Sequence, residues 1–200
     1  MDSIAMAGIV KFVLTTNINP IKAAKKFRRD KRVSELERLA NAEILVGFPQ
    51  GATNTDPDTG ETVSVAEYAR KNNYGTMVKF HGKDVPVPAR PFFTEGFYFD
   101  KYQEKRIQLA KNIARQVVQG KISAEQGAGL IGVQAVNDVR DSIQTGPWVE
   151  NSPYTKAKKL KRSRGKKAGS VKPLIDTGTM IGAVTYIVNM ENTDSGKESK

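Results

Sequence analysis

Apolar residues along this chain fall into short β-branched runs and longer stretches with helical spacing. The runs GIVKFVLTT (8–16) and EILVGF (43–48) predict strands, because Val, Ile and aromatic residues fit a pleated surface. The Asn-Pro pair at 19–20 predicts a helix start, since proline is accepted in a first turn. Ser34, with Glu37 three residues later, predicts the cap of a second helical piece.

The next stretch of the chain predicts a loop, a short helix and a hairpin. Residues 50–62 are rich in Gly, Pro and Asp, which indicates an exposed loop. VSVAEYARKNNYG (63–75) predicts a short helix that ends at its glycine. Residues 76–85 predict a strand or hairpin with its turn at Gly82-Lys83-Asp84, and prolines 86, 88 and 91 predict an extended segment.

Two long helices follow. The first is predicted over 92–119, where Tyr102, Leu109, Ile113 and Val117 recur at helical spacing with Arg106 between them. Ser123 and Gln126 form a capping-box pattern that predicts the start of the second helix, which ends at Gly146-Pro147. The predicted apolar face of the second helix consists of Ala128, Ile131, Ala135, Val139 and Ile143.

The C-terminal part of the chain predicts an arm and a closing strand. Residues 148–172 indicate an irregular, basic stretch, with a flexible arm over 149–173. A short helix or turn is predicted at 176–182, a strand at 183–190 and a disordered tail at 191–200. The chain is therefore predicted to form a single α+β domain over 1–190. In it a small mixed or antiparallel sheet packs against two long helices, with extended loops and arms.

The net charge of +11 is concentrated in one segment. Residues 156–172 hold nine basic residues and no acidic ones, so the remaining 23 basic and 21 acidic residues leave only +2 elsewhere. A second basic cluster spans 22–32 and is interrupted only by Asp30. Charge gathered in such patches creates a field that a polyanion feels.

Composition argues against most kinds of chemical site. The chain has no cysteine, which excludes disulfides and thiolate metal sites, and its single histidine is His81. His81 has no partner at a recognisable catalytic spacing, so a hairpin histidine is the favoured interpretation. We expect no enzyme activity, no catalytic residue, no cofactor, no metal and no small-molecule substrate.

The N-terminus does not resemble a signal peptide, because it carries Asp2 and lacks a basic start. No apolar run approaches the ~18 residues of a membrane span. We therefore expect no membrane partner.

Two motif-like stretches have plainer interpretations. Gly127-Ala-Gly129-Leu-Ile-Gly132 matches GxGxxG, but a dinucleotide site needs a strand before this motif, so close helix packing is favoured. Asp56 to Glu67 has some of the oxygen ligands of a calcium loop but lacks its required glycine, so an exposed turn is favoured.

The basic run leaves two interpretations open. It is either a solvated loop or a surface that contacts phosphates or a partner protein, without reading base sequence. The candidate contact residues are Lys156, Lys158, Lys159, Lys161, Arg162, Arg164, Lys166 and Lys167. Trp148, the single tryptophan, is typical of a core or interface anchor.

Several stretches, in order, resemble one protein family. They are ILVGFPQG (44–51), YARKNNYG with VPARPFF (68–93), and TGPW with NSPYT and KPLIDTGTM (145–180). Together they resemble the neck and tail-completion proteins of tailed phages, the broad family that includes the minor tail protein Z of lambda-like phages. The resemblance covers about residues 40–190. Asn73 departs from it, since it stands near where many relatives carry Glu or His.

The resemblance implies a structural virion protein, made in the host cytoplasm, that forms a ring at the head–tail junction. Such a ring completes the neck or tail, joins the tail to the capsid connector and surrounds the DNA channel. The expected ring has six copies, with twelve as the alternative, and a basic arm repeated around its axis.

The implied neighbours of the ring are connector, tail-terminator or tail-tube proteins and packaged double-stranded DNA. Trp148, Arg90, Phe92 and Phe93 are the expected interface anchors, with Arg90 held by local hydrogen bonds. The alternative is a monomeric or dimeric protein that binds nucleic acid without sequence preference.

Overall fold

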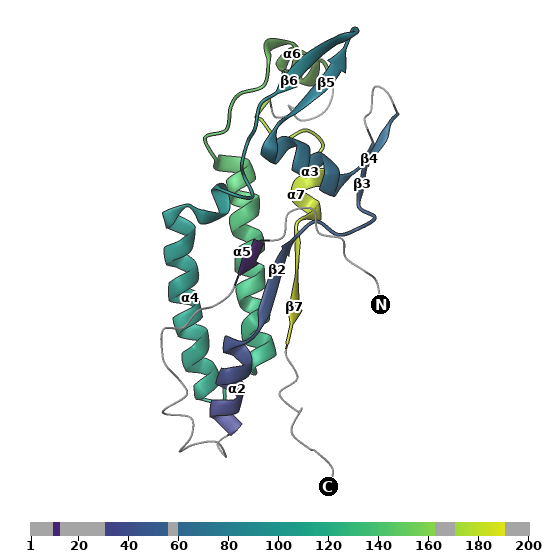
Figure 1. Cartoon of the computed structure of the whole chain (residues 1–200). Helices are drawn as coiled ribbons and strands as arrows, with labels where there is room; N and C mark the ends of the chain where they lie inside the picture. Colours follow the sequence, from purple (N-terminus) through teal and green to yellow (C-terminus); the bar gives the residue numbers. More distant parts are fainter. Residues whose placement is uncertain (1–9, 13–30, 56–59, 163–170, 191–200) are drawn as a thin grey trace. The chain divides into compact units, whose positions relative to one another are not determined.

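The structure is a computed structural model, and it describes residues 10–12, 31–55, 60–162 and 171–190. It is an α+β fold, as the sequence predicts (Figure 1). In chain order the elements are β1 (Val10–Phe12), α2 (Lys31–Ala40), β2 (Glu43–Gly47), β3 (Thr53–Thr55), β4 (Thr62–Ser64), α3 (Val65–Tyr74), β5 (Thr76–Phe80), β6 (Lys83–Val87), the 3-10 helix η1 (Gly96–Tyr98), α4 (Asp100–Val118), α5 (Ala124–Thr145), α6 (Pro153–Arg162), α7 (Thr179–Ala183) and β7 (Thr185–Asn189).

The strands form three small sheets. β2 lies between β1 and β7 in one sheet. β2 and β7 run in opposite directions (Figure 1), and the side chain of Asn189 at the end of β7 bonds to Glu43 at the start of β2 at 3.2 Å. β3 pairs with β4 and β5 pairs with β6, both antiparallel.

The chain divides into two compact units. Of the described residues, unit 1 contains 47–55, 60–99, 136–162 and 171–185, and unit 2 contains 11–12, 31–46, 100–135 and 186–190, so neither is one continuous stretch of sequence. The single domain expected over 1–190 stays a prediction.

Unit 2 is organised around a buried apolar cluster. The cluster joins α2, β2 with the residue before it, α4 and the first half of α5. Its members are Leu39, Ala42, Ile44, Ala110, Ile113, Val117, Ala124, Ala128 and Ile131. Its helical members repeat at three- and four-residue intervals, which places them on one stripe of each helix. All five apolar positions predicted for α5 are buried, so that sequence prediction is confirmed.

The glycines of the GxGxxG-like stretch lie inside α5 and allow close packing. A Cβ on Gly127 would meet Ile113 Cγ2 at 2.7 Å, and one on Gly132 would meet the Tyr186 ring at 2.2 Å. Gly127 therefore lets α5 approach α4, as the sequence predicts, and Gly132 makes room for an aromatic ring from β7.

The start of α5 is held by the predicted capping box and by a carboxylate from α2. Gln126 N donates to Ser123 Oγ at 3.1 Å, and Ser123 N donates to Gln126 Oε1 at 3.0 Å. Glu35 of α2 accepts a bond from Ala124 N at 2.8 Å and one from Arg38 at 2.6 Å. The bond from the Ala124 amide, followed by that from Arg38, lowers the pKa of Glu35.

Unit 1 has a core of aromatic side chains. Phe48, Phe92, Phe93 and Phe97 are buried, and the rings of Phe48 and Phe93 lie 6.1 Å apart. α3 packs on α7, and Arg140 of α5 donates to the carbonyls of Ile181, Gly182 and Val184 at the end of α7. A guanidinium thus binds carbonyls that a helix end leaves open.

Three boundaries predicted from sequence are wrong. Ser34 lies inside α2 and is not a cap. The helix predicted from residue 92 begins at Asp100, because residues 92–99 form turns and η1, in which Glu95 N and Gly96 N both donate to Pro91 O. The predicted loop 50–62 contains β3, whose Thr55 hydroxyl bonds with Thr62 of β4 at 2.9 Å.

The basic segment is also more ordered than predicted. Pro153–Arg162 is the helix α6, where the sequence predicts an irregular stretch. Ser152 starts α6, since its Oγ accepts a bond from Thr155 N at 3.2 Å. The predicted helix near residue 20, most of the 22–32 basic cluster, part of the calcium-like loop (56–59) and the tail 191–200 lie outside the described residues.

Candidate functional site

The predicted contact residues begin on α6, and its lysines differ in what they contact. Lys161 is exposed, whereas Lys156 forms an ion pair with Glu150, and this contact lowers the pKa of the Glu150 carboxyl. Lys158 is half-buried, and Arg162 is the last residue of α6. Arg164, Lys166 and Lys167 lie outside the described residues. Of the lysines on α6, Lys161 is therefore the one that is exposed.

Lys159 faces inward and binds the backbone. It is 9 % exposed, and its Nζ donates to Lys172 O at 2.9 Å and to Ile175 O. Between these two carbonyls lies Leu174, which is buried and has a φ of 62°, a conformation that costs a residue with a Cβ about 1 kcal/mol or more. The ammonium of Lys159 thus stabilises a strained turn.

Asn151 joins the two ends of the basic segment. Its Nδ2 donates to Val171 O at 3.0 Å and to Lys172 O at 3.2 Å, and its Oδ1 accepts a bond from Arg90. Residues 151 and 171 are therefore held together on either side of the basic segment. The arm predicted over 149–173 is tethered at its base by these bonds.

Arg90 is the centre of this tether. It is 5 % exposed, and its guanidinium donates to Val149 O at 2.7 Å, Glu150 O at 3.3 Å and Asn151 Oδ1 at 3.2 Å. Burial lowers the pKa of Arg90. The expected local hydrogen bonds are thus replaced by bonds to residues about sixty positions away, because the segment before α6 runs beside the one after β6.

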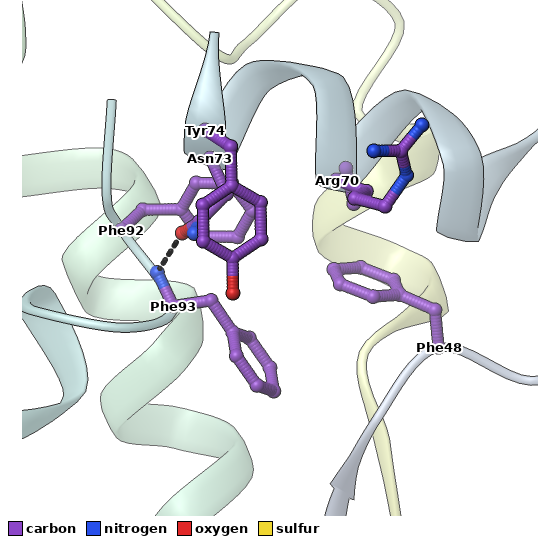
Figure 2. Close-up of a pocket in the computed structure, with 7 residues that line it drawn as sticks. Phe48, Arg70, Asn73, Tyr74, Phe92 and Phe93 are labelled. Carbon is purple, nitrogen blue, oxygen red and sulfur yellow. Dashed lines mark hydrogen bonds between the residues drawn. The ribbon is translucent and has the colours of Figure 1, made fainter. Parts of the chain in front are cut away.

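The other expected anchors lie inside unit 1. Phe92 and Phe93 are buried and line a pocket with Phe48, Asn73 and Tyr74 (Figure 2). The pocket holds about 10 Å³, roughly what one water molecule needs. These two rings therefore support the fold from within and present little surface to a partner.

Trp148 is half-buried against the end of α5. Its Nε1 donates to Ser142 O at 2.7 Å and its ring stacks on Phe99 at 5.9 Å. A Cβ on Gly146 would come within 2.3 Å of the indole, and one on Gly96 within 3.0 Å. Both glycines thus make room for the ring, which anchors the turn after α5.

Asn73, the residue that departs from the resembled family, organises the turn that leads to η1. Its Oδ1 accepts a bond from Phe93 N at 2.9 Å (Figure 2). The same oxygen accepts a bond from Thr94 N at 3.4 Å, and Nδ2 donates to Thr94 Oγ1 at 3.1 Å. Next to it, Asn72 O accepts a bond from Arg90 N at 2.8 Å. The end of α3 therefore holds the segment that carries Arg90.

The β5–β6 hairpin beside α6 exposes large apolar side chains. Met77, Val78, Phe80 and Val85 are each 38 to 59 % exposed, and Phe80 contacts Tyr154 of α6 with ring centres 5.0 Å apart. The turn is His81-Gly82, with φ of 49° and 74°, one residue earlier than predicted, and both positive φ values suit a tight hairpin. Together with Tyr154, these four exposed side chains form the hairpin face.

A second basic surface lies in unit 2. Lys31, Arg32 and Lys121 line a groove of about 480 Å³ near the start of α5. Glu35 also lines it, and its carboxylate already occupies the backbone donor at Ala124. The capping box takes further donors, so the helix start is satisfied by the protein's own groups.

Comparisons of the chain with family models, with curated proteins and with solved structures give no match. Across residues 31–55, 60–162 and 171–190, no helix combines the length and apolar composition needed to cross a bilayer. The same described residues contain no cluster of three or more His, Asp or Glu side chains arranged for a metal ion.

Sequence reasoning missed the residues that organise the site. Asn151, Arg140 and the inward-facing Lys159 all act on backbone carbonyls from elsewhere in the sequence. A lysine among eight other basic residues gives no local signal of burial.

Proposed function

We propose that this chain is a structural subunit of a tailed-phage virion that forms a ring at the head–tail junction. In this proposal the ring completes the neck or tail, joins the tail to the capsid connector and surrounds the DNA channel. Six copies are the favoured number, with twelve as the alternative. Its neighbours are connector, tail-terminator or tail-tube proteins, and the chain performs no catalysis and needs no cofactor.

One observation carries the proposal: the stretches that resemble the family contact one another in unit 1. Phe48 from ILVGFPQG packs on Phe93 from VPARPFF, and Asn73 from YARKNNYG accepts the Phe93 amide. Arg90 from VPARPFF donates to the carbonyls that follow TGPW. The quoted stretches therefore form one bonded group in unit 1, which a ring subunit could use as a rigid body.

The last motif belongs to the same group of contacts. In KPLIDTGTM, the carbonyls of Lys172 and Ile175 accept the bonds from Lys159, and Leu174 is buried. Gly178 has a φ of 84° and is the N-cap of α7, which no side chain caps, and Thr177 Oγ1 accepts a long bond from Thr179 N at 3.4 Å, so a turn precedes α7. The motif thus forms the base to which the basic segment is tied.

The exposed surfaces suit an assembly subunit. A ring needs apolar contacts between copies or neighbours, and the hairpin face supplies side chains that the fold leaves open. A ring also repeats each exposed cation around its axis, so Lys161 and the basic residues after it would create a strongly positive zone. Such a zone suits packaged DNA or an acidic neighbour.

A second candidate function is non-specific binding of nucleic acid by a monomer or dimer. The exposed Lys161 and the basic composition of residues 156–172 favour it, because lysines that displace counterions bind phosphates without reading bases. It predicts tight binding of free duplex that weakens steeply with salt. The ring proposal instead predicts that purified chain associates with connector-bearing heads.

Electron microscopy of the full chain, alone and mixed with DNA-filled heads that carry connectors, tests the proposal. The expected result is rings with an axial channel, seated on the connector. A quadruple change of Lys161, Arg164, Lys166 and Lys167 to Gln should leave subunits folded but reduce DNA retention by the joined particles. The matched control changes four exposed cations of unit 2, Lys105, Lys111, Arg115 and Lys121, to Gln.

Monomers that do not bind the heads, but bind duplex DNA with an affinity that falls steeply as salt rises, would support the second candidate instead. If both quadruple variants retain DNA equally, the basic segment is only a solvated loop.

A further inference from the structure

The two outer edges of the β5–β6 hairpin are not equivalent. The tight turn at His81-Gly82 makes Phe80 and Lys83 the closing, hydrogen-bonded pair of the ladder. Hydrogen-bonded pairs alternate, so the backbone groups of Val78 also face β6, whereas those of Met77 and Lys79 face away from it. Each strand therefore presents an outer edge.

Prolines close the edge of β6. Pro86 lies opposite Met77, at a position whose N–H would face outward, and Pro88 follows just after the strand. Proline removes the donor that another strand would use, which is a common way to block an edge. The edge of β6 is thus unsuited to pairing.

The edge of β5 is open. Residues 76–80 contain no proline, and in the described part of the chain no backbone group outside the hairpin bonds to Met77 or Lys79. The Met77 carbonyl has one long contact, from Thr76 Oγ1 at 3.5 Å. β5 is protected only by its short length and by Lys79, whose ammonium is held by Asp84 at 3.0 Å, so its edge is less blocked than the proline-closed edge of β6.

An apolar strip accompanies the open edge. Val78, Phe80 and Val85 lie on one face of the hairpin, because alternate residues share a face and Val78 is opposite Val85. All three are about 40 % exposed, and Tyr154 extends the strip at 58 %. A further strand at the β5 edge would cover part of this strip.

We propose that β5 pairs antiparallel with β5 of a second copy of this chain, with the two-fold axis at Val78. In this register Met77 of each copy lies opposite Lys79 of the other, and each such pair exchanges both of its backbone hydrogen bonds. Residues 76–80 then overlap completely. The result is a four-stranded sheet whose apolar strips are continuous.

The charges of β5 fit this register. A pairing centred on Lys79 would put two lysines directly opposite each other, which is unfavourable. The Val78-centred pairing puts Lys79 opposite Met77, while Asp84 of the same copy keeps its 3.0 Å ion pair with Lys79. The strand is therefore self-complementary in one register.

The contact is expected to be weak. A pair of five-residue strands buries well under the ~1,200 Å² typical of stable interfaces, so association should depend on concentration in the micromolar-to-millimolar range. The pairing is two-fold, whereas a cyclic ring uses head-to-tail contacts. The proposal therefore goes beyond the ring function, and either can fail alone.

Sedimentation velocity of the full chain over a range of concentrations tests the pairing with two matched variants. Lys79→Pro and Asp84→Pro remove the same ion pair and one outward N–H each, but on opposite edges of the hairpin. Lys79→Pro should weaken dimer formation at least tenfold. Asp84→Pro should stay within about threefold of the unchanged chain, with circular dichroism confirming that both fold.

Amide hydrogen exchange gives an independent measurement on the unchanged chain. The Met77 and Lys79 amides should exchange more slowly as protein concentration rises, while the Asp84 amide should not change. The pairing is overturned if the chain stays monomeric up to millimolar concentration, or if the exchange rates of the Met77 and Lys79 amides do not change with protein concentration. It is also overturned if Lys79→Pro associates as well as Asp84→Pro, a result that leaves the ring proposal intact.

Discussion

Apolar side chains are buried in the helix core of unit 2 but exposed on the β5–β6 hairpin of unit 1. In the core, Ile113 and Ile131 are almost fully buried, and even glycine positions are filled by neighbouring side chains. In the hairpin, Met77 and Phe80 are 59 % and 40 % exposed. Burial of apolar surface explains why the core positions are apolar. The exposed apolar side chains of the hairpin add little to the stability of the single chain, so their apolar character needs another explanation.

The lysines of α6 repeat the contrast on a smaller scale. Lys159 is buried and stabilises the turn at Leu174, whereas Lys161 is exposed on the same helix. One cation serves the fold and the other is available to a partner. Substitutions at buried and exposed positions separate these two roles, and the expected effects decrease from Ile113 through Arg90 and Lys159 to Glu35.

Ile113→Ala should destabilise the chain most. Its side chain is 1 % exposed in the unit 2 cluster, so the loss of burial and the remaining cavity should cost about 3 kcal/mol of unfolding free energy. Val85→Ala, at 38 % exposure on the hairpin, should cost less than about 1 kcal/mol. Chemical denaturation of both variants measures the difference, and equal losses would contradict the contrast.

Arg90→Met should cost about 2 kcal/mol, because the hydrogen bonds of its charged group to Val149 O, Glu150 O and Asn151 Oδ1 are lost. Thermal unfolding measures this loss. Arg70→Met, an exposed arginine of α3, is the control and should change little. If the two variants melt alike, Arg90 does not hold the segment before α6.

Lys159→Met should cost about 1–2 kcal/mol and loosen the turn that it binds. Amide exchange at residues 171–175 should speed up, because the Leu174 conformation loses its support. Lys161→Met is the matched control on the same helix and should leave these amides unchanged. Unaltered exchange in Lys159→Met would mean that the turn is stable without the ammonium.

Glu35→Gln should have the smallest effect, visible in the pH dependence of stability. The pKa of Glu35 is lowered in the folded chain, so its contribution is present above the ordinary glutamate pKa. It is lost as pH falls through the lowered folded value. Denaturation between pH 7 and pH 3 should therefore show a shallower acid decline for Glu35→Gln, while an unchanged slope would argue against the Ala124 contact.

The sequence predicted the elements whose signals are local. The apolar face of α5 and its Ser123–Gln126 capping box follow from spacing and residue type, and so does the closing strand, predicted at 183–190 and observed at 185–189. The α+β class follows from the order of such elements.

The sequence did not predict what depends on distant partners. The residues of α6 predict an irregular stretch because lysine-rich segments look solvated, and the partners of Lys159 lie beyond the end of the helix. Arg90 was expected to bond locally, but its acceptors are sixty residues away. The location of the turn at His81-Gly82 required a positive φ at a histidine, which residue type alone does not indicate.

The most direct test of the central claim is the position of this chain in a phage particle. Gold labelling of an epitope on the full chain, viewed by electron microscopy of mature virions, would locate it. The account predicts label at the head–tail junction of every particle, and unjoined heads and tails when the chain is missing. Particles that join and infect normally without the chain, and carry no label, would contradict it.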